Sequence, residues 1–374
     1  MSITIMLTRK ERAKALLDKK AGLIRLCRSV VLILGVIFMN ACSNKTVAQA
    51  ANECPKDVPQ PYTDALIIES KYDQSDSTKS KLKAKQDPKA KEIKQRIDGY
   101  TKGLVKFSEY LLSDSEKKQQ LAVICIHSWL TAWASEDALL TDEVSKTGRA
   151  VRKWALASIN SMIIKSSVMS QNQFKLTQTE TDWIAKLAAK VVEDYDVRLK
   201  TDFKYFNNHD HWAAWAVFSS GYITKNREFT DWAFESFNKS LSLAKTNYRG
   251  QYAYFPIEVA RSKLAVNYSH FSLTPLVLLE HYLPKAGYKV APEQSEILSQ
   301  LVSFAVVSTL SPETFSELLS AKQAKVERYK LAWLIPYLSN HKDHVLARKL
   351  YQKYEGKVDG YSLIGGRVQP LYEG

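Results

Sequence analysis

The spacing of apolar residues predicts helices along most of the chain. From about residue 92 onward, apolar side chains recur at i, i+3, i+4 and i+7, which is the spacing of one face of an α-helix. No stretch alternates convincingly between apolar and polar positions, as a half-buried strand would. The periodicity predicts about eleven helices, over residues 92–112, 116–135, 141–166, 178–198, 211–224, 228–244, 256–267, 270–283, 293–310, 313–338 and 343–354.

The segments between these helices predict how the helices pack. Several helices open with residues that commonly cap a helix, namely Thr177, Asp210, Asn226 and Ser311. The connections are short, so consecutive helices are expected to pair antiparallel, either as an α/α toroid or as a helical bundle. No 34-residue repeat is visible, which argues against a regular solenoid. The sequence therefore predicts a single all-α domain over residues 51–374.

Residues 1–50 have the layout of an export signal followed by a linker. Residues 1–28 carry eight Lys and Arg against two acidic residues, and an apolar run follows from Val30 to Phe38. That run is too short to span a bilayer as a resident helix. Cleavage before Cys42 would give a lipid anchor, and cleavage after Ala50 would release a free N-terminus. Both alternatives place the mature protein in the periplasm, without a transmembrane helix.

Cysteine usage is consistent with export. Cys54 and Cys125 are the two cysteines outside the signal region, and an even pair in an oxidising compartment predicts a disulfide. It would close a loop of about 70 residues and stabilise the fold by roughly 4 kcal/mol. The alternative is two unpaired thiols.

The charge of the chain suggests an anionic partner. The net charge is +14, and residues 1–41 hold eight basic and two acidic residues, which leaves +8 for the rest. A basic surface attracts nucleic acid, anionic lipid or acidic polysaccharide, and export makes nucleic acid an unlikely partner. A general solubility charge is the alternative. Alternating Lys79, Lys81, Lys83 and Lys85 form either a solvated face or a flap over a cleft.

The richest cluster of functional side chains lies at residues 205–215. If a helix begins near Asp210, Asn208 and His209 lie at its N-terminus, where partial positive charge and free N–H groups favour an anion. Trp212 and Trp215 offer flat apolar faces of the kind on which sugars stack. The alternative is a capping Asn, a core His and two core Trp.

A second candidate cluster contains Arg261 and Tyr268. These residues are seven apart, so on one helix they would share a face about two turns apart. Arginine offers a planar donor fork that suits a carboxylate. Tyrosine can transfer a proton if nearby cations lower its pKa. The pair alone is commonplace.

Together these clusters resemble polysaccharide lyase family 5, the mannuronate-specific alginate lyases. The resemblance covers about Cys54 to Tyr282 in separate blocks. The blocks are Asn-Asn-His-x-x-Trp-Ala-Ala-Trp at 207–215, Ala-Arg-x-x-x-Ala-x-x-Tyr at 260–268, Leu273-Thr274-Pro275-Leu276, Trp129-x-x-x-Trp133-Ala134-x-x-Asp137-Ala138-Leu139-Leu140, Cys54-Pro55, Pro61-Tyr62-Thr63, Ser70-Lys71-Tyr72 and Ser75-Asp76-Ser77.

The resemblance implies an incomplete α/α toroid with a deep cleft and a mobile lid, and β-elimination at a 4-linked uronate. It implies that Asn208, His209 and Arg261 neutralise the sugar carboxylate and that Tyr268 transfers protons, with His209 as the alternative base. Lys71 and Tyr72 would lie in the lid and bind substrate, and Trp212 would line a subsite. A monomer without metal or organic cofactor is expected.

Four residues near these motifs depart from the family pattern. Asp210 and His211 stand where a small polar residue and a Tyr are usual, and Ile257-Glu258-Val259 replaces a more usual Asn-Glu-Leu. The added carboxylate of Asp210 near the cleft should repel a polyuronate unless it points away as a helix cap. These departures bear on the identity of the substrate more than on the type of reaction. Another polyuronate, for example one that contains glucuronate, and a non-catalytic polyuronate-binding protein therefore remain as alternatives. His209 and His211 do not face one site on a helix, which argues against a metal.

Overall fold

A computed structural model describes residues 54–247 and 250–373. Residues Lys56–Gly374 form one unit, and residues up to Pro55 form another, of which only Cys54 and Pro55 are described. The predicted export signal and both predicted cleavage sites therefore lie outside the described residues. Cys54 and Cys125 are disulfide-bonded.

The regular secondary structure of the described residues is almost entirely helical, which confirms the predicted all-α class. They contain eleven α-helices and one small antiparallel sheet of two-residue strands. The helices are α2 (Pro88–Glu109), α3 (Glu116–Ser135), α4 (Lys146–Met169), α5 (Gln178–Lys200), α6 (Asn208–Thr224), α7 (Arg227–Ser242), α8 (Pro256–Val259), α9 (Ala265–Tyr282), α10 (Pro292–Leu310), α11 (Leu334–Asn340) and α12 (Val345–Lys353), and the strands are β1 (Lys245–Thr246) and β2 (Ala253–Tyr254).

Most helices lie where periodicity placed them, and α3 has the predicted bounds. Thr177 and Asn226 cap α5 and α7 as expected. The predicted helix over residues 313–338 is wrong: this segment holds two short 3-10 turns, extended chain and α11. Hydrogen bonds to another part of the chain replace its helical ones, because Ala324 N donates to the carbonyl of Lys263 and the Asn267 amide donates back to the carbonyl of Ala324.

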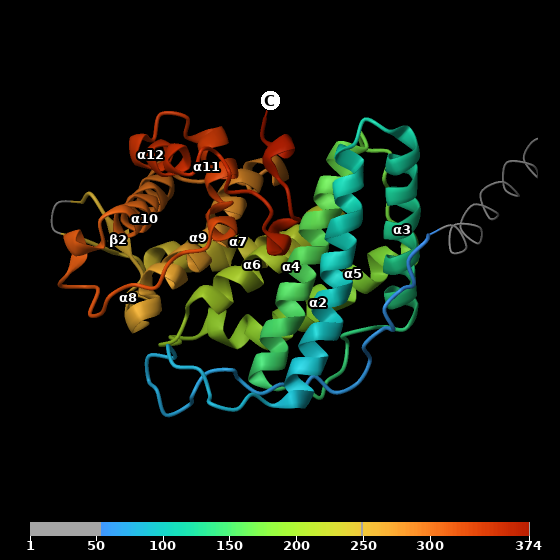
Figure 1. Cartoon of the computed structure of the whole chain (residues 1–374), viewed down its shortest axis with the longest axis horizontal. Helices are drawn as coiled ribbons and strands as arrows, with labels where there is room; N and C mark the ends of the chain where they lie inside the picture. The colour runs from blue at the N-terminus through green and yellow to red at the C-terminus, as the bar shows by residue number, and fades with distance from the viewer. Residues whose placement is uncertain (1–53, 248–249, 374) are drawn as a thin grey trace, which may run out of the picture. The chain divides into compact units, whose positions relative to one another are not determined.

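Helix α6 is the centre of the fold. It contacts α4, α5, α7 and α9, and in Figure 1 it lies between α2–α5 on one side and α8–α12 on the other. Its residues from Asp210 to Gly221 are buried on every face. A Cβ at Gly221 would lie 2.7 Å from the Asn226 carbonyl oxygen, so this close turn into α7 requires glycine. The first turn of α6 is therefore held by packing from four sides.

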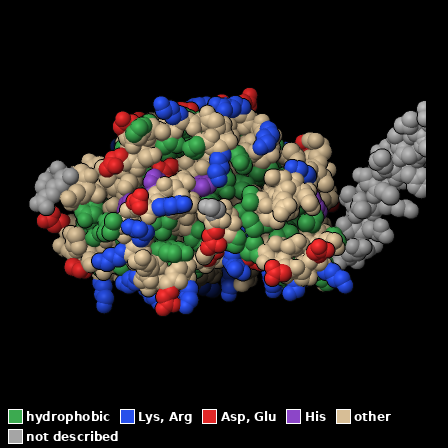
Figure 2. Space-filling view, turned by 90° about the horizontal axis from the view of Figure 1, so that it is seen from above, with side chains coloured by type: hydrophobic (Ala, Val, Ile, Leu, Met, Phe, Trp, Pro, Cys, Tyr) green, Lys and Arg blue, Asp and Glu red, His purple; other side chains and the backbone are tan. Residues whose placement is uncertain are grey.

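The surface carries both signs of charge. Lys and Arg side chains alternate with Asp and Glu on the face shown in Figure 2. Within residues 54–247 and 250–373, no helix combines the length and apolar character needed to cross a bilayer.

Candidate functional site

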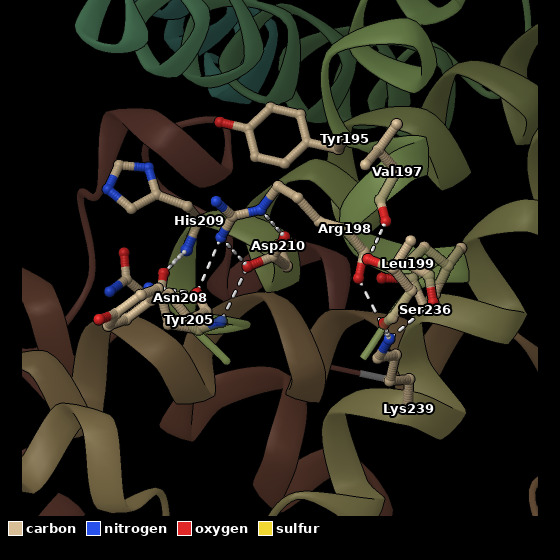
Figure 3. A network of polar contacts seen from close by, with 12 residues as sticks. Tyr195, Val197, Arg198, Leu199, Tyr205, Asn208, His209, Asp210, Ser236 and Lys239 are labelled. Atoms are coloured by element: carbon tan, nitrogen blue, oxygen red, sulfur yellow. Dashed lines mark hydrogen bonds and ion pairs between the residues drawn. The ribbon is translucent and has the colours of Figure 1, made fainter. Parts of the chain in front are cut away.

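The first turn of α6 is fixed by a capping box. Helix α6 begins at Asn208, two residues before the expected start, and Asn207 is its N-cap, whose side chain accepts from His209 N at 2.9 Å. Asp210 is the third residue of the helix and accepts from Asn207 N at 2.8 Å. Arg198 of α5 donates two hydrogen bonds to the same carboxylate, from Nε and from an Nη atom, each at 2.5 Å (Figure 3). The prediction that Asp210 caps the helix is wrong, yet Asp210 anchors its start.

Glu258 of α8 holds Asn208 in place. Its carboxylate accepts from Asn208 N at 2.8 Å and from Asn208 Nδ2 at 2.9 Å. It also lies 3.9 Å from Nε of Arg261. Glu258 is fully buried, and burial raises its pKa, while Arg261 and Asn208 act in the opposite direction. The Glu258 carboxylate therefore faces Asn208 and Arg261.

Two buried polar atoms next to Glu258 are unsatisfied. Asn208 Oδ1 and Arg261 Nε have no hydrogen-bond partner among the described residues. A buried donor or acceptor left unpaired costs about 1–3 kcal/mol, so such atoms need an explanation. One acceptor and one cationic donor side by side suit the hydroxyl and carboxylate of an acidic sugar.

Tyr268 of α9 lies against Arg261 and Tyr72. The Arg261 guanidinium lies 4.6 Å from the centre of the Tyr268 ring, and Tyr268 Oη donates to Tyr72 Oη at 3.0 Å. Burial raises the pKa of Tyr268, and Tyr72 raises it further, while Arg261 acts in the opposite direction. The expectation of a lowered pKa is therefore wrong for the protein without substrate, in which Tyr268 is a neutral phenol.

Arg261 and Tyr268 do not share a continuous helix. Helix α8 ends at Val259, a 3-10 turn spans Ser262–Leu264, and α9 begins at Ala265. Ser262 has a φ of 50°, a left-handed conformation that is uncommon for a residue other than glycine. The prediction that Arg261 and Tyr268 share one face of one helix is therefore wrong. The guanidinium of Arg261 nevertheless lies over the Tyr268 ring.

His209 is partly exposed and has a buried lysine behind it. Its Nδ1 lies 2.7 Å from Nζ of Lys153 on α4, and its ring stacks on Trp154 with 5.5 Å between ring centres. Burial lowers the pKa of His209 well below its usual value, and Lys153, Arg198 and Arg261 lower it further. His209 is therefore a neutral imidazole at neutral pH.

The structure separates the predicted substrate-binding residues. Tyr72 reaches the site through its bond to Tyr268, and the Lys71 ammonium is exposed at 5.2 Å from the centre of the Tyr72 ring. The prediction that Trp212 lines a subsite is wrong in this structure. Its side chain is 0% exposed and its Nε1 donates to the carbonyl of Phe271, so it has no free face for a sugar.

The two departures from the family pattern at 210 and 211 also point away from any ligand. Asp210 and His211 are 2% and 1% exposed, and His211 Nδ1 lies 2.7 Å from Ser272 Oγ. Their effect on a substrate can only be indirect. Among the residues that the structure describes, no group of three His, Cys, Asp or Glu is placed to hold a metal ion.

Comparison with known proteins gives the family of this chain. The alginate lyase family profile matches residues 68–315. The chain belongs to the alginate lyase family. The alginate lyase of Pseudomonas paraeruginosa is 30% identical over 332 residues, which cover 86% of each chain, and that of Azotobacter vinelandii is 30% identical over 77% of this chain and 76% of its own. This membership confirms the resemblance seen in the sequence and the prediction of a polysaccharide lyase.

Solved structures of the alginate lyase family confirm the fold. Alginate lyase A1-III of Sphingomonas species A1 superposes with a TM-score of 0.64 at 16% identity, covering 86% of this chain and 87% of the other. A variant of that enzyme complexed with a tetrasaccharide gives a TM-score of 0.66 at 17% identity, covering 86% of each chain. The predicted α/α toroid is thereby confirmed.

Proposed function

We propose that this protein cleaves mannuronate-rich alginate by β-elimination at the site formed by Asn208, His209, Arg261 and Tyr268. The observation that carries the proposal is the chain of contacts from Asn208 through Glu258 to Arg261 and on to Tyr268. It joins an amide, a guanidinium and a phenol from three separate elements. A uronate has a carboxylate, a C5 proton and a leaving O4, and these groups correspond to that set.

Charge stabilisation is the first task of the site. The C5 proton of a uronate lies next to a carboxylate whose negative charge resists formation of a carbanion. Arg261 supplies positive charge and donors to that carboxylate, His209 supplies a further donor, and the N-terminus of α6 adds partial positive charge. The donors of Asn208 are themselves held by Glu258. Preorganised donors of this kind stabilise the enolate-like transition state. Glu258 and Asp210 serve by holding Asn208 and the start of α6 in place.

Proton transfer is the second task. The C5 proton leaves to a base as the C4–C5 double bond forms, and the C4–O4 bond breaks as O4 takes a proton. In mannuronate the C5 proton and O4 lie on the same side of the ring, so Tyr268 alone can take one proton and deliver it to O4. Tyr268 must first lose its own proton. Tyr72 Oη, at 3.0 Å, can take that proton only as it passes its own hydroxyl proton to solvent, and Tyr72 is partly exposed. Arg261 favours the resulting phenolate.

A group of three lysines supports a polyanionic substrate. Burial lowers the pKa of Lys94 and of Lys330, and the ammonium of Lys71 lowers each pKa further. Lys330 Nζ donates to Asn267 Oδ1 at 3.0 Å, next to Tyr268 in the chain. Three cations from distant segments repel one another unless an anion joins them, and neighbouring uronates of the polymer supply such anions.

Absorbance of the unsaturated uronate product tests the proposal. Purified protein is incubated in parallel with polymannuronate, polyguluronate and polyglucuronate. The proposal expects a rise on polymannuronate that exceeds the other two. A rise only on polyglucuronate keeps the elimination chemistry and changes the substrate, and no rise on any polymer contradicts the proposal.

We also propose that the protein acts as a periplasmic monomer. It needs no metal or organic cofactor, because Arg261, His209 and Tyr268 supply both tasks. The basis for export is the signal-like pattern of residues 1–50. Sequencing the mature N-terminus from a periplasmic fraction separates cleavage before Cys42 from cleavage before Ala51. Sedimentation of the purified protein tests the monomer.

A further inference from the structure

Lys153 occupies an unusual position for a lysine. Its side chain is 0% exposed, and its ammonium lies on α4 between two aromatic rings, 4.8 Å from the centres of both Trp154 and Tyr195. Burying a lysine is costly unless its polar atom is engaged. Nζ bonds to Tyr195 Oη at 2.7 Å and to His209 Nδ1 at 2.7 Å. Of Lys153, Tyr195 and His209, only the His209 imidazole is partly exposed.

We infer that Lys153 is a positioning residue that fixes the tautomer of His209, so that Nε2 carries the hydrogen and donates it to the uronate carboxylate. A neutral imidazole has one N–H and one acceptor nitrogen. Lys153 donates to Nδ1, which makes Nδ1 the acceptor. The hydrogen must then lie on Nε2, the nitrogen farther from α4. This inference rests on the proposed function only for its catalytic consequence.

The inference does not depend on the charge of Lys153. An ammonium has three hydrogens and a neutral amine has two, so either form can donate to both Tyr195 and His209. The opposite tautomer needs Nδ1–H to donate to a free lone pair on Nζ. Only the neutral amine has such a lone pair, and the hydroxyl of Tyr195, whose Oη lies 2.7 Å from Nζ, competes for it.

The charged groups around Lys153 and His209 keep the His209 imidazole neutral. The groups that act on Lys153 and His209 are Lys146, Asp194, Arg198, Asp210 and Arg261. Arg198 is neutralised by its bonds to Asp210. The remaining cations oppose a second proton on His209, so the imidazole stays neutral, and its tautomer stays defined, as pH falls.

The consequence is a division of roles within the site. With Nδ1 occupied and Nε2 protonated, His209 has no lone pair directed into the cleft. It can bind the carboxylate but cannot take the C5 proton. The C5 proton then goes to Tyr268, and the alternative assignment of His209 as the base is excluded.

Nitrogen NMR of the imidazoles tests the tautomer directly. The chain has seven histidines, and the His209 signals are those absent from a His209→Gln spectrum. In the wild type we expect an unprotonated Nδ1 and a protonated Nε2 between about pH 5 and pH 8. In Lys153→Met, which removes the donor and keeps the side-chain length, we expect mixed tautomers. A protonated Nδ1 in the wild type, or an unchanged Lys153→Met spectrum, would overturn the inference.

Lys165 provides a matched control for Lys153→Met. It lies on the same helix and is also 0% exposed, but its Nζ bonds to Glu109 and to the carbonyl of Gly365. Lys165→Met should lower stability and leave the His209 tautomer unchanged.

Kinetics provide the second readout. Lys153→Met should lower kcat on polymannuronate by at least about tenfold, because a wrong tautomer misplaces the hydrogen. Full kcat in a folded Lys153→Met protein with mixed tautomers would overturn the positioning role. Absence of lyase activity in the wild type would contradict the proposed function, while the NMR result would still decide the tautomer.

Discussion

The hydroxyl of Tyr268 donates a hydrogen bond of 3.0 Å to the hydroxyl of Tyr72, a residue 196 positions earlier in the chain. This contact joins α9 to the irregular segment before α2. It raises the pKa of Tyr268 in addition to the effect of burial. It also supplies a relay through which the proton of Tyr268 can pass to solvent before Tyr268 acts as a base, because Tyr72 is partly exposed. One contact therefore connects the proposed lid residue to the proposed proton-transfer residue.

Tyr72→Phe tests this coupling through pH. Removal of the Tyr72 hydroxyl removes an influence that raises the pKa of Tyr268. If the phenolate is the base, kcat/KM rises as pH rises through that pKa, so the rise should occur at lower pH in the variant. The position of the rise is compared between variant and wild type on polymannuronate. A rise displaced to higher pH would contradict the role of Tyr268 as the base.

Glu258→Gln tests whether the buried carboxylate positions the site. Glutamine keeps the size of the side chain but removes the charge near Arg261 and offers only one acceptor oxygen to Asn208. We expect kcat to fall by roughly 10- to 100-fold, because charge-assisted hydrogen bonds hold Asn208 and the opposite charge of Glu258 faces Arg261. Glu280→Gln is the matched control, since Glu280 is also buried but pairs with His341. An equal loss of kcat in both variants would mean that neither acts through the site.

Trp212→Phe separates packing from substrate binding. The Trp212 indole is 0% exposed and donates to the carbonyl of Phe271. Phenylalanine leaves a cavity and an unpaired carbonyl, so the free energy of unfolding should fall by about 2–3 kcal/mol. KM for polymannuronate should stay within about twofold. A raised KM with unchanged stability would restore Trp212 to a subsite.

Buried neutral histidines predict a loss of stability in acid. Burial lowers the pKa of His211 from 6.5 to about 3, and likewise that of His270. Between these values the unfolded chain binds a proton that the native protein does not, so the free energy of unfolding falls as pH falls. Each histidine contributes a slope of about 1.4 kcal/mol per pH unit. In urea unfolding from pH 6 to pH 4, His211→Gln should reduce the slope by that amount and His270→Gln by the same. An unchanged slope in both variants would contradict neutral burial.

Periodicity predicts the helices well where packing follows the local pattern. Helix α3 has its predicted bounds, because its buried stripe and its termini are both visible in the sequence. The prediction of a helix over residues 313–338 fails because hydrogen bonds tie Ala324 to Lys263 and Asn267 and replace the helical ones. Partners 57 or more residues away leave no trace in local spacing. The sequence does not predict the break between α8 and α9 for a related reason, since no glycine or proline marks the turn at Ser262.

The sequence predicts which residues form the site better than what each residue does. Asn208, Arg261 and Tyr268 lie in one chain of contacts, and the structure places His209 beside Asn208. Lys153 could not be found, because a lysine before a tryptophan in a helix usually snorkels to the surface. The prediction for Trp212 is wrong because packing alone decides whether a tryptophan near the start of a helix faces the core or the cleft.

The rate of unsaturated product formation by Tyr268→Phe on polymannuronate tests the central claim most directly. Loss of the phenol removes the proton-transfer group and leaves the ring against Arg261, so folding should be kept. We predict that kcat falls by about 10²- to 10⁴-fold, the usual contribution of a positioned acid or base. Polymer binding should persist. A folded Tyr268→Phe protein with wild-type kcat would show that the phenol does not transfer the proton and would contradict the account.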